Sequence, residues 1–358
     1  MLKEIKFFDY PSLYLRFENE FDQIFKDVCT RGAFILQKDL QLFEKNLAKF
    51  LDVKFVFGVA DGTNAIILGL KACGVKPGDE IIMSSHTYIA TAASVKLVGA
   101  SPIFADIGDD FLLSAKNVEN KITNKTVGIM PTQLNGRCCN MDELNYIAKK
   151  YNIKIFEDSA QGLGASFNGR RAGTFGSFGT ISFYPAKVLG CFGDGGAVMT
   201  NDDNIAKELS LLRDHGRDED GNVISWGTNS RLDNLQAAFL NFRLSKYSED
   251  ISRRREIAGI YNNGLNKLKH VYLPPPPMKQ KNFDVYQNYE LAAENRDDLQ
   301  KYLKKNGIST IIQWSGSPVH HFKDLGFGKD KYKDLQKTNW FFERCLMLPM
   351  HMALSDKD

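Results

Sequence analysis

The chain has 358 residues, of which 43% are hydrophobic and 25% are charged, a balance typical of a globular protein. Its formal net charge of +3 is too small to favour nucleic acid or an anionic membrane surface as a partner. No apolar stretch approaches the ~18 residues that a membrane span requires, and charges interrupt the first residues where a secretory signal needs an apolar core. The six cysteines follow neither a C-x-x-C nor a zinc spacing, so we expect reduced thiols and a cytoplasmic protein.

Between residues 54 and 200, short apolar runs alternate with amphipathic stretches. The apolar runs predict strands at residues 55–59, 80–83, 102–105, 127–130 and 153–156. The amphipathic stretches predict helices at residues 62–73, 90–97 and 141–151. This alternation is typical of an α/β layer with a largely parallel sheet. Two further strands, predicted at 181–184 and 197–200, follow each other without a helix between them, so we expect the sheet to be mixed at one side.

The pattern changes after residue 201. Residues 235–265 contain no proline and predict a long helix, and four consecutive prolines at 274–277 then predict a stiff extended segment. The remainder predicts a smaller α+β unit, with a strand at 289–292, a helix at 297–305 and a strand at 309–313. We therefore expect a large domain over residues 1–245, including an N-terminal arm, and a small C-terminal domain over residues 246–358.

One lysine occupies a position where a lysine is costly. The segment SFYPAK, residues 182–187, ends a predicted strand and places Lys187 before the apolar and glycine-rich run 188–193. A buried ammonium group is unfavourable unless it is paired or neutralised. The glycines on both sides permit tight turns and the close approach of a ligand, but they form neither a dinucleotide fingerprint nor a P-loop. These glycines are Gly173, Gly176, Gly179, Gly190, Gly193, Gly195 and Gly196.

The segment ADGTNA, residues 60–65, follows a predicted strand and opens a predicted helix. The N–H groups and the positive dipole end at a helix N-terminus bind anions such as phosphate. Gly62 would let the backbone approach a phosphate closely, and Thr63 would add a hydroxyl donor. A simple helix N-cap is the alternative interpretation of this segment.

Two further segments offer candidate ligand contacts. Asp158 and Gln161 follow the strand predicted at 153–156, and the ligand crevice of an open α/β sheet lies at such strand ends. The Asp158 carboxylate can keep a heterocyclic nitrogen protonated through a charge-assisted hydrogen bond, with a helix cap as the alternative. Tyr88 lies just past the strand predicted at 80–83 and can stack on a flat heteroaromatic ring, with a core tyrosine as the alternative.

Together these residues match the requirements of pyridoxal 5′-phosphate (PLP). They offer a phosphate cradle, an aromatic platform, a carboxylate for a pyridine nitrogen and a lysine whose pKa can be tuned by burial. Enzymes hold PLP as a Schiff base with a lysine, and an acidic side chain pairs with its pyridinium nitrogen. The hypothesis explains Lys187, because a covalently bound lysine avoids most of the cost of a buried ammonium group.

Five motifs in the same order resemble those of the DegT/DnrJ/EryC1/StrS nucleotide-sugar aminotransferases, from about residue 32 to the C-terminus. The motifs are G-T-x-A at residues 62–65, E-D-x-A-Q at 157–161, S-F-Y-P-x-K at 182–187, G-D-G-G-A at 193–197 and N-x-R-x-D-x-x-Q-A-A at 229–238. The resemblance implies the α/β architecture of the fold-type I aminotransferases. This consists of a PLP-binding large domain with a mixed, mostly parallel seven-stranded sheet, and a smaller α+β domain. The active site would be shared between the subunits of a homodimer.

The resemblance also implies roles in cofactor binding. Lys187 would carry the cofactor covalently, Asp158 would face the pyridine nitrogen, and Gln161 would reach the ring hydroxyl. Tyr88 would occupy the stacking position above the ring. The residues implied to hold the phosphate are Gly62, Thr63 and Ser182, with Asn229 from the neighbouring subunit.

Four residues are candidates for contact with the sugar substrate: Tyr184, His215, Arg231 and His321. Loop anchoring is the alternative role for His215. His321 follows His320 directly, and if the two lie on a strand they point to opposite faces, which argues against a shared metal ion.

The implied reaction is transamination in two halves. The amino donor, expected to be L-glutamate, leaves as 2-oxoglutarate, and the amino group then passes to a keto group of a nucleotide-linked deoxysugar. The products would be deoxyamino sugars for surface glycans such as lipopolysaccharide. Lys187 would move the proton, as general base and then as general acid. Some members of the family carry histidine at the lysine position and dehydrate sugars, and Lys187 argues against that activity.

Three segments resemble members that act at C-3 of dTDP-3-keto-6-deoxyhexoses: GAFIL at residues 32–36, TIIQW at 310–314 and VHH at 319–321. Gln37 departs from that subgroup, in which glycine is expected. The alternative is a C-4 aminotransferase that acts on a UDP- or GDP-4-keto-6-deoxy sugar. Two other classes stay open at this point, a PLP-binding regulator without turnover and a nucleotide-binding domain without PLP.

Overall fold

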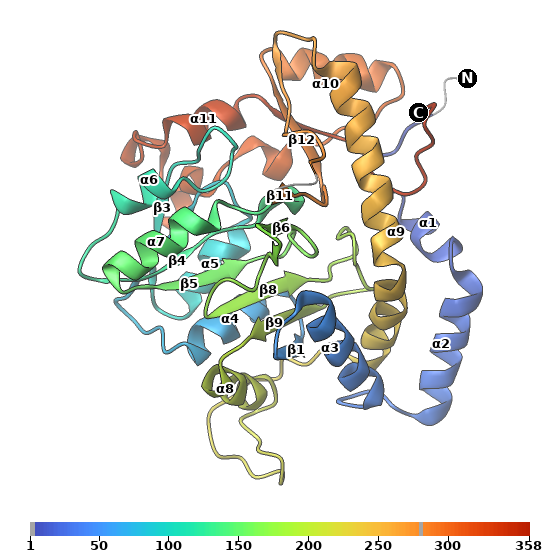
Figure 1. Ribbon diagram of the computed structural model, residues 1–358, viewed down its shortest axis with the longest axis vertical. Coiled ribbons are helices and arrows are strands. Elements are labelled where there is room, and N and C mark those ends of the chain that lie inside the picture. The colour runs from blue at the N-terminus through green and yellow to red at the C-terminus, as the bar shows by residue number, and fades with distance from the viewer. Residues whose placement is uncertain (1–3, 279–281) are drawn as a thin grey trace.

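A mixed seven-stranded sheet forms the centre of the molecule in the computed structural model, which describes residues 4–278 and 282–358 (Figure 1). The strand order is β1-β9-β8-β5-β4-β2-β3. All neighbouring strands run parallel except β9, which is antiparallel to both β1 and β8, so the predicted mixed side of the sheet is confirmed. The strands are β1 (Phe55–Val59), β2 (Glu80–Ser84), β3 (Ser101–Ala105), β4 (Thr126–Met130), β5 (Lys154–Asp158), β8 (Phe178–Ser182) and β9 (Gly196–Thr200).

Helices cover both faces of this sheet, because its strands present apolar side chains to both sides. On β2, Ile81 and Met83 belong to one buried cluster and Ile82 to the other, as the two-residue period of a strand requires. The first face packs against α4 (Gly62–Ala72), α5 (Ile89–Leu97) and α8 (Asp203–Arg213). The second face packs against α3 (Lys38–Leu51), α7 (Met141–Tyr151) and α9 (Asn234–Leu265). A short helix, α6 (Ala115–Glu119), lies next to α7.

An N-terminal arm lies along α9 on the outside of the molecule (Figure 1). It consists of α1 (Tyr10–Leu15) and α2 (Glu18–Arg31). The buried ring of Phe21 joins the arm to the rest of the chain through edge contacts with Phe192, Phe239 and Phe242. Aromatic pairs of this kind stabilise beyond their buried area, so the arm is a packed element of the fold.

The C-terminal part contains a small antiparallel sheet in the order β10-β12-β13. Its strands are β10 (Val271–Tyr272), β12 (Tyr289–Ala293) and β13 (Cys345–Leu348), accompanied by α10 (Arg296–Lys305) and α11 (Gln336–Phe342). A further three-stranded sheet joins β11 (Asn282–Phe283) to β6 (Ser166–Phe167) and β7 (Arg170–Arg171).

The strand predicted at 309–313 is wrong. Ile311 makes a single antiparallel bridge with Met347, and a 3₁₀ turn, η2 (Gln313–Gly316), follows directly. Trp314 and Ser315 have φ angles of 46° and 58°, in the left-handed region that no strand uses. The apolar run therefore resembles a strand in composition but turns before it can pair.

Helix α9 connects the two parts of the chain without a break (Figure 1). Ala237 and Leu240, near its N-terminus, belong to the core beneath the large sheet, whereas Ile257 and Ala258 belong to the core of the small sheet. The domain boundary that we predicted between residues 245 and 246 falls inside this helix. We keep the division as a proposal, since each half of α9 packs on a different core.

Among the described residues, no helix combines the length and the apolar character that crossing a membrane requires. The cysteines are free thiols, and four of the six are buried.

Candidate active site

The predicted site residues meet at one edge of the large sheet. Asp158 ends β5 and Ser182 ends β8, and these two parallel strands are neighbours. The N-terminus of α4 follows β1, whose direction matches that of β8 because β9 runs antiparallel between them. This edge is the carboxyl end of the parallel strands, where α/β proteins bind ligands.

The N-terminus of α4 is close to the end of β8. A Cβ atom on Gly62 would lie 2.9 Å from the Cβ of Ser182, so glycine is what allows this approach. Asp61 caps the helix, because its carboxylate accepts the Asn64 N–H at 2.8 Å. The N–H groups of Gly62 and Thr63 have no acceptor within the helix, as in the first turn of any α-helix. The cap that we considered as an alternative is therefore present together with an anion-binding geometry.

Lys187 lies in the tight turn that follows β8, residues 183–190, which we call the lysine loop. Its N–H donates to the Tyr184 carbonyl at 2.8 Å, and the next N–H, of Val188, donates to Gln287 Oε1 at 2.9 Å. Burial lowers the pKa of the Lys187 amine from 10.5 to about 8, and the Asp158 carboxylate acts weakly in the opposite direction. Near neutral pH the neutral form, in which the amine acts as a nucleophile, is therefore far more populated than for an ordinary lysine.

Asp158 is 4% exposed and is fixed on all sides. Its Oδ2 accepts a hydrogen bond from Thr91 Oγ1 at 2.6 Å, and its Oδ1 accepts the Ala160 N–H at 3.1 Å. Its backbone N–H donates to the Pro131 carbonyl at 3.1 Å, and its carbonyl accepts the Gln133 N–H at 2.9 Å. A carboxylate held in this way is preorganised to accept one further donor.

Gln161 and Tyr88 complete the candidate cofactor contacts. Gln161 Oε1 accepts the Asn135 N–H at 2.8 Å, which leaves its amide N–H groups as donors for a ligand. Tyr88 precedes α5 and is 56% exposed, so the alternative of a core tyrosine is wrong. Its ring lies 6.3 Å from that of Trp314.

Two polar side chains that we did not predict hold the backbone around the site. The buried Glu157 carboxylate accepts hydrogen bonds from the Gln133 amide and from three backbone N–H groups of the turn 173–176, although burial still raises its pKa. In the same region a Cβ on Gly179 would lie 2.0 Å from the Gly173 carbonyl oxygen. Backbone packing, and not ligand approach, thus explains these two glycines.

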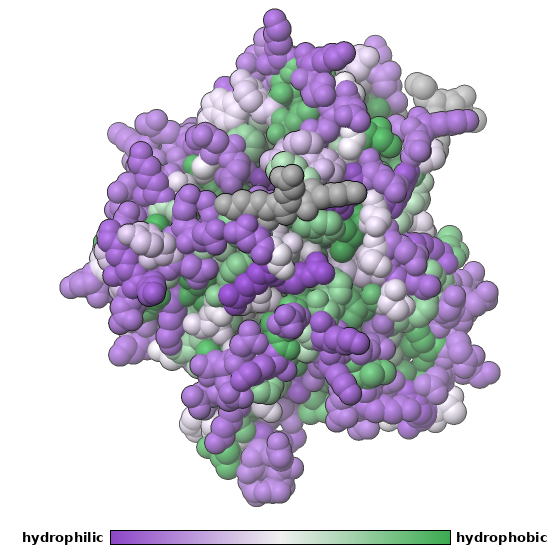
Figure 2. All heavy atoms as spheres, in the orientation of Figure 1, coloured by the Kyte–Doolittle hydropathy of each residue, from purple (hydrophilic) through white to green (hydrophobic). Residues whose placement is uncertain are grey.

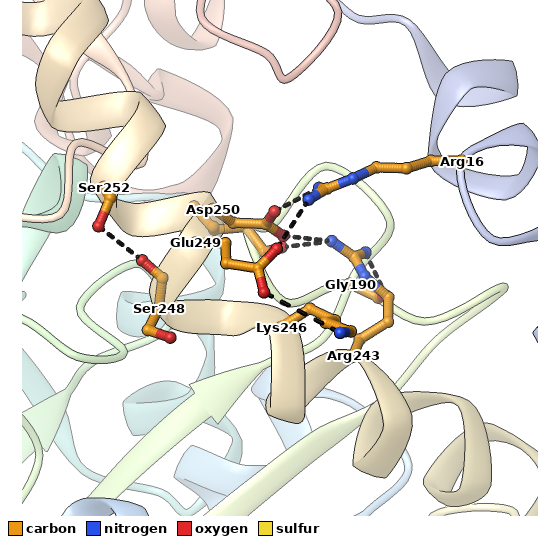
Figure 3. Close-up of polar contacts among 9 residues, drawn as sticks. Arg16, Gly190, Arg243, Lys246, Ser248, Glu249, Asp250 and Ser252 are labelled. Carbon is orange, nitrogen blue, oxygen red and sulfur yellow. Dashed lines mark hydrogen bonds and ion pairs between the residues drawn. The ribbon is translucent and has the colours of Figure 1, made fainter.

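Arg243 of α9 is the second polar side chain, after Glu157, that holds the backbone around the site (Figure 3). Its guanidinium donates to the carbonyls of Val188 at 2.9 Å and Gly190 at 3.1 Å, directly after Lys187. Its charge is balanced by Asp250, at 3.3 Å and 1% exposed, which also binds Arg16 of the N-terminal arm. The lysine loop, α9 and the arm therefore share one ion-pair network. The sequence gives no local signal for this network, since its members are far apart in the chain.

The four candidate substrate residues do not form a single group. Tyr184 is exposed in the lysine loop and close enough to Tyr10 to affect the pKa of that phenol. Arg231 pairs with Asp214 at 2.8 Å. His215 is exposed, has a φ of 58° and donates its N–H to the Thr228 carbonyl, which favours the loop-anchoring alternative.

His321 lies in a 3₁₀ turn, η3 (Val319–His321), and not on a strand, so the argument from opposite strand faces does not apply to it. Its Nε2 contacts Asn339 Oδ1 at 2.7 Å, and Nε2 of His320 contacts the same oxygen at 3.1 Å. Within the described part of the chain, no three or more His, Cys, Asp and Glu side chains cluster as metal ligands.

Asn229 lies outside the contacts described above. It is exposed in the segment that follows α8, where its backbone pairs with Asp214. The adjacent Ser230 is buried and its Oγ accepts the Ala60 N–H at 3.4 Å, so this segment borders the turn that leads into α4.

The hollow beside Lys187 is small. It measures about 40 Å³ and is lined by the lysine loop, by Tyr10 of the arm, and by Arg243 and Arg254 of α9. A larger hollow of about 500 Å³ lies between α2 and α9, far in sequence from the lysine loop and without a candidate catalytic residue. The chemistry of the side chains, and not the size of the hollow, identifies the site.

The residues at this edge fit PLP. Lys187, a partly exposed residue, provides an amine whose pKa is lowered by desolvation, and Asp158 provides a fixed carboxylate for the ring nitrogen. The α4 N-terminus and the Ser182 hydroxyl provide phosphate donors next to a glycine that a Cβ would crowd. No step of the fit depends on a metal ion.

Comparison with known proteins agrees with this site. A family model described as the DegT/DnrJ/EryC1/StrS aminotransferase family matches residues 16–358. The UDP-2-acetamido-2-deoxy-3-oxo-D-glucuronate aminotransferase of Pseudomonas aeruginosa is 36% identical over 98% of this chain and 96% of its own. The dTDP-3-amino-3,4,6-trideoxy-alpha-D-glucose transaminase of Streptomyces venezuelae is 37% identical over 97% of this chain and 91% of its own.

Solved structures extend the likeness to three dimensions. The S. venezuelae protein DesV, solved in complex with an intermediate, superposes with a TM-score of 0.94 at 35% identity, over 98% of this chain and 94% of its own. A Bacillus subtilis structure with bound cofactor PMP superposes with a TM-score of 0.89 at 29% identity, over 98% of this chain and 81% of its own. The predicted fold-type I architecture and the PLP cofactor are thereby confirmed. The chain therefore belongs to the DegT/DnrJ/EryC1/StrS aminotransferase family, as a PLP-dependent nucleotide-sugar aminotransferase.

Proposed function

We propose that the chain transfers the amino group of L-glutamate to the C-3 keto group of a dTDP-linked 3-keto-6-deoxyhexose, for the synthesis of deoxyamino sugars in surface glycans such as lipopolysaccharide, in the cytoplasm. The observation that carries the transaminase chemistry is that Asp158, at the end of β5, is near enough to Lys187 to affect the pKa of its amine, at the sheet edge where α4 begins. Support for C-3 comes from the relatives, since one is named for a 3-oxo sugar and the other for a 3-amino sugar.

The proposed roles follow from the positions of the side chains. Bound PLP supplies an electron sink for the carbon that loses or gains a proton. Lys187 attaches the cofactor, and its Nζ then takes and returns that proton, for which a pKa of about 8 suits an amine near neutral pH. The Asp158 carboxylate would keep the ring nitrogen protonated, and the Gln161 amide would donate to the ring hydroxyl. The exposed Tyr88 would stack on one face of the ring.

The phosphate contacts extend this proposal to a homodimer. Gly62, Thr63 and Ser182 hold the phosphate from one chain, and Asn229 reaches the same phosphate in the neighbouring chain. The segment that carries Asn229 projects beyond α8 and exposes Trp226 at 97% (Figure 1). Helices α1 and α2 also expose hydrophobic side chains, among them Leu15 at 62% and Phe25 at 53%. Figure 2 shows apolar surface in this region. Exposed apolar side chains of this kind favour a covered interface.

The alternative is amination at C-4 of a UDP- or GDP-linked 4-keto-6-deoxy sugar. A relative named GDP-perosamine synthase, from Caulobacter vibrioides, is 36% identical over 92% of this chain, so a GDP-sugar stays a candidate. The contacts of Tyr184, Arg231 and His321 to a sugar are likewise proposals.

Two experiments test the function. Borohydride reduction of the holoenzyme, followed by peptide mapping, should give a single cofactor adduct on Lys187, and an adduct elsewhere or none at all contradicts the assignment. Lys187→Ala should fold and lose turnover, because this lysine makes a covalent bond and not a packing contact.

The substrate is tested with a panel of dTDP-, UDP- and GDP-linked 3-keto and 4-keto sugars. Incubation with L-glutamate should yield one 2-oxoglutarate per aminated sugar, and NMR of the product should show the nitrogen on C-3. Nitrogen on C-4 would favour the alternative, and sugar dehydration without 2-oxoglutarate would contradict transamination altogether.

A further inference from the structure

Three buried threonines form a chain of hydrogen bonds that ends on Asp158. Thr91 Oγ1 donates to Asp158 Oδ2 at 2.6 Å, Thr87 Oγ1 lies 2.6 Å from Thr91 Oγ1, and Thr132 Oγ1 lies 2.9 Å from Thr87 Oγ1. Their exposed fractions are 0% for Thr91, 1% for Thr87 and 6% for Thr132. Thr91 belongs to α5, while the other two follow β2 and β4. Three separate parts of the sheet edge therefore converge on one carboxylate.

The direction of these hydrogen bonds follows from the available protons. A hydroxyl group has one proton to donate, and an ionised carboxylate has none. Since Thr91 donates to Asp158, it must accept the proton of Thr87, and Thr87 in turn accepts the proton of Thr132. All three O–H dipoles point toward the carboxylate, and hydrogen bonds in such a chain strengthen one another.

We propose that Thr91, supported by Thr87 and Thr132, is a positioning residue that fixes the orientation of the Asp158 carboxylate toward the ring nitrogen of the cofactor. An oriented carboxylate accepts the ring N–H in a charge-assisted hydrogen bond, which keeps the proton on the ring nitrogen. This inference rests on the proposed role of Asp158, and it adds the group that keeps the carboxylate in that role.

The Thr91 hydroxyl sets the orientation of the carboxylate. It occupies one lone pair of Oδ2, and the Ala160 N–H occupies one of Oδ1. A carboxylate accepts about four hydrogen bonds, so further lone pairs remain for the ring N–H. Without the hydroxyl group, Oδ2 loses this donor, and only the Ala160 N–H at Oδ1 still orients the carboxylate.

The test uses holoenzyme reconstituted with PLP that carries ¹⁵N in the ring, because the ¹⁵N chemical shift distinguishes a protonated from a neutral ring nitrogen. Thr91→Val keeps the side-chain volume and removes the donor, and it should change the ratio of protonated to neutral nitrogen about ten-fold toward neutral. Thr91→Ser keeps the donor and should retain the wild-type shift. Thr132→Val, at the far end of the chain, should move the shift in the same direction by less.

The matched control is Thr200→Val. Thr200 is 3% exposed on β9 and donates to the Ser177 carbonyl at 2.8 Å, so it also loses a buried hydrogen bond but has no part in the threonine chain. It should leave the ring signal unchanged. The rate at which L-glutamate converts PLP to its amine form in a single turnover should fall about ten-fold in Thr91→Val. The rate should stay near wild type in Thr91→Ser and Thr200→Val.

The outcomes separate this inference from the proposed function. A wild-type shift in Thr91→Val overturns the positioning role and leaves Asp158 in place, and if that variant does not fold, an unchanged shift in Thr132→Val overturns it equally. A neutral ring nitrogen in the wild type overturns both this inference and the role of Asp158. Loss of the borohydride adduct on Lys187 overturns the proposed function itself.

Discussion

The Lys187 amine has opposite effects on activity and on stability. In the cofactor-free protein, burial lowers its pKa from 10.5 to about 8, so the charged form is less favourable in the folded than in the unfolded chain. The folded state is therefore less stable by the full amount of this penalty below about pH 8. The penalty declines as the pH rises from about 8 to 10.5, because the unfolded chain binds more protons than the folded chain in this range.

Lys187→Met should therefore stabilise the cofactor-free protein. We expect the free energy of unfolding to rise by about 3–3.5 kcal/mol at pH 7, since the pKa is lowered from 10.5 to about 8 and one pKa unit corresponds to about 1.4 kcal/mol. The gain should shrink toward pH 10. Urea unfolding at both pH values measures it, with Lys207→Met on the exposed side of α8 as the control, which should change little. An equal gain at pH 7 and pH 10 contradicts burial of the charge as the cause.

Asp158→Asn tests the charge on the carboxylate. Asparagine keeps the size of the side chain but cannot balance a cationic ring nitrogen, so the glutamate half-reaction should slow by about 100-fold or more. Single-turnover absorbance measurements follow this rate. The adduct on Lys187 should persist in this variant, and a rate equal to that of the wild type would give the carboxylate another role.

At the scale of an element, the N-terminus of α4 is proposed to bind the phosphate through its backbone. Gly62→Ala adds a Cβ atom 2.9 Å from the Ser182 Cβ, and it should weaken PLP binding about ten-fold by moving the two phosphate contacts apart. Pyridoxal, which lacks the phosphate, should bind as well as before. Titration of the cofactor-free protein with both compounds measures the ratio.

Gly259→Ala on α9 is the control for this substitution. A Cβ there meets no atom within 4 Å, so alanine should leave cofactor affinity unchanged and stabilise the helix slightly. If Gly62→Ala weakens PLP and pyridoxal equally, the α4 N-terminus does not act on the phosphate.

Most elements of the large sheet could be predicted from the sequence. Helix α7 begins and ends where the amphipathic pattern predicted, and strands β1 to β5 differ from their predicted ends by at most two residues. These segments could be predicted because strands, with a period of two residues, alternate along the chain with helices, whose period is 3.6 residues. Helices α2 and α3, at the start of the chain, and the short strand β13 were not predicted.

Cofactor residues near strand ends were also readable, because each follows an apolar run that fixes its place at the sheet edge. The sequence could not reveal Thr91 or Arg243. Thr91 sits inside a helix with no motif around it, and Arg243 acts through two carbonyls more than fifty residues away in the chain. The strand predicted at 309–313 failed because a positive φ at Trp314 is not visible in an apolar run.

At the scale of the whole molecule, the proposed homodimer makes a sharp prediction for mixed subunits. If Asn229 serves the neighbouring site, a chain with Lys187→Ala and a chain with Asn229→Ala together contain one intact site per mixed dimer. After co-refolding in equal amounts, about a quarter of the wild-type activity should return. Each variant alone should be inactive or strongly impaired. No recovery after mixing, with dimers present by sedimentation, would mean that Asn229 acts within its own chain or not at all.

Helix α9 also has a mechanical consequence. Ile257 packs in the core of the small sheet, and Arg243 donates hydrogen bonds to two carbonyls of the lysine loop. We therefore expect a tilt of the C-terminal end of α9 to displace the carbonyls beside Lys187. An unbroken helix provides no hinge at the middle of the chain. The position of the small sheet and the orientation of the Lys187 amine therefore depend on the same helix. We expect a substitution that shifts one end of α9 to affect the other end.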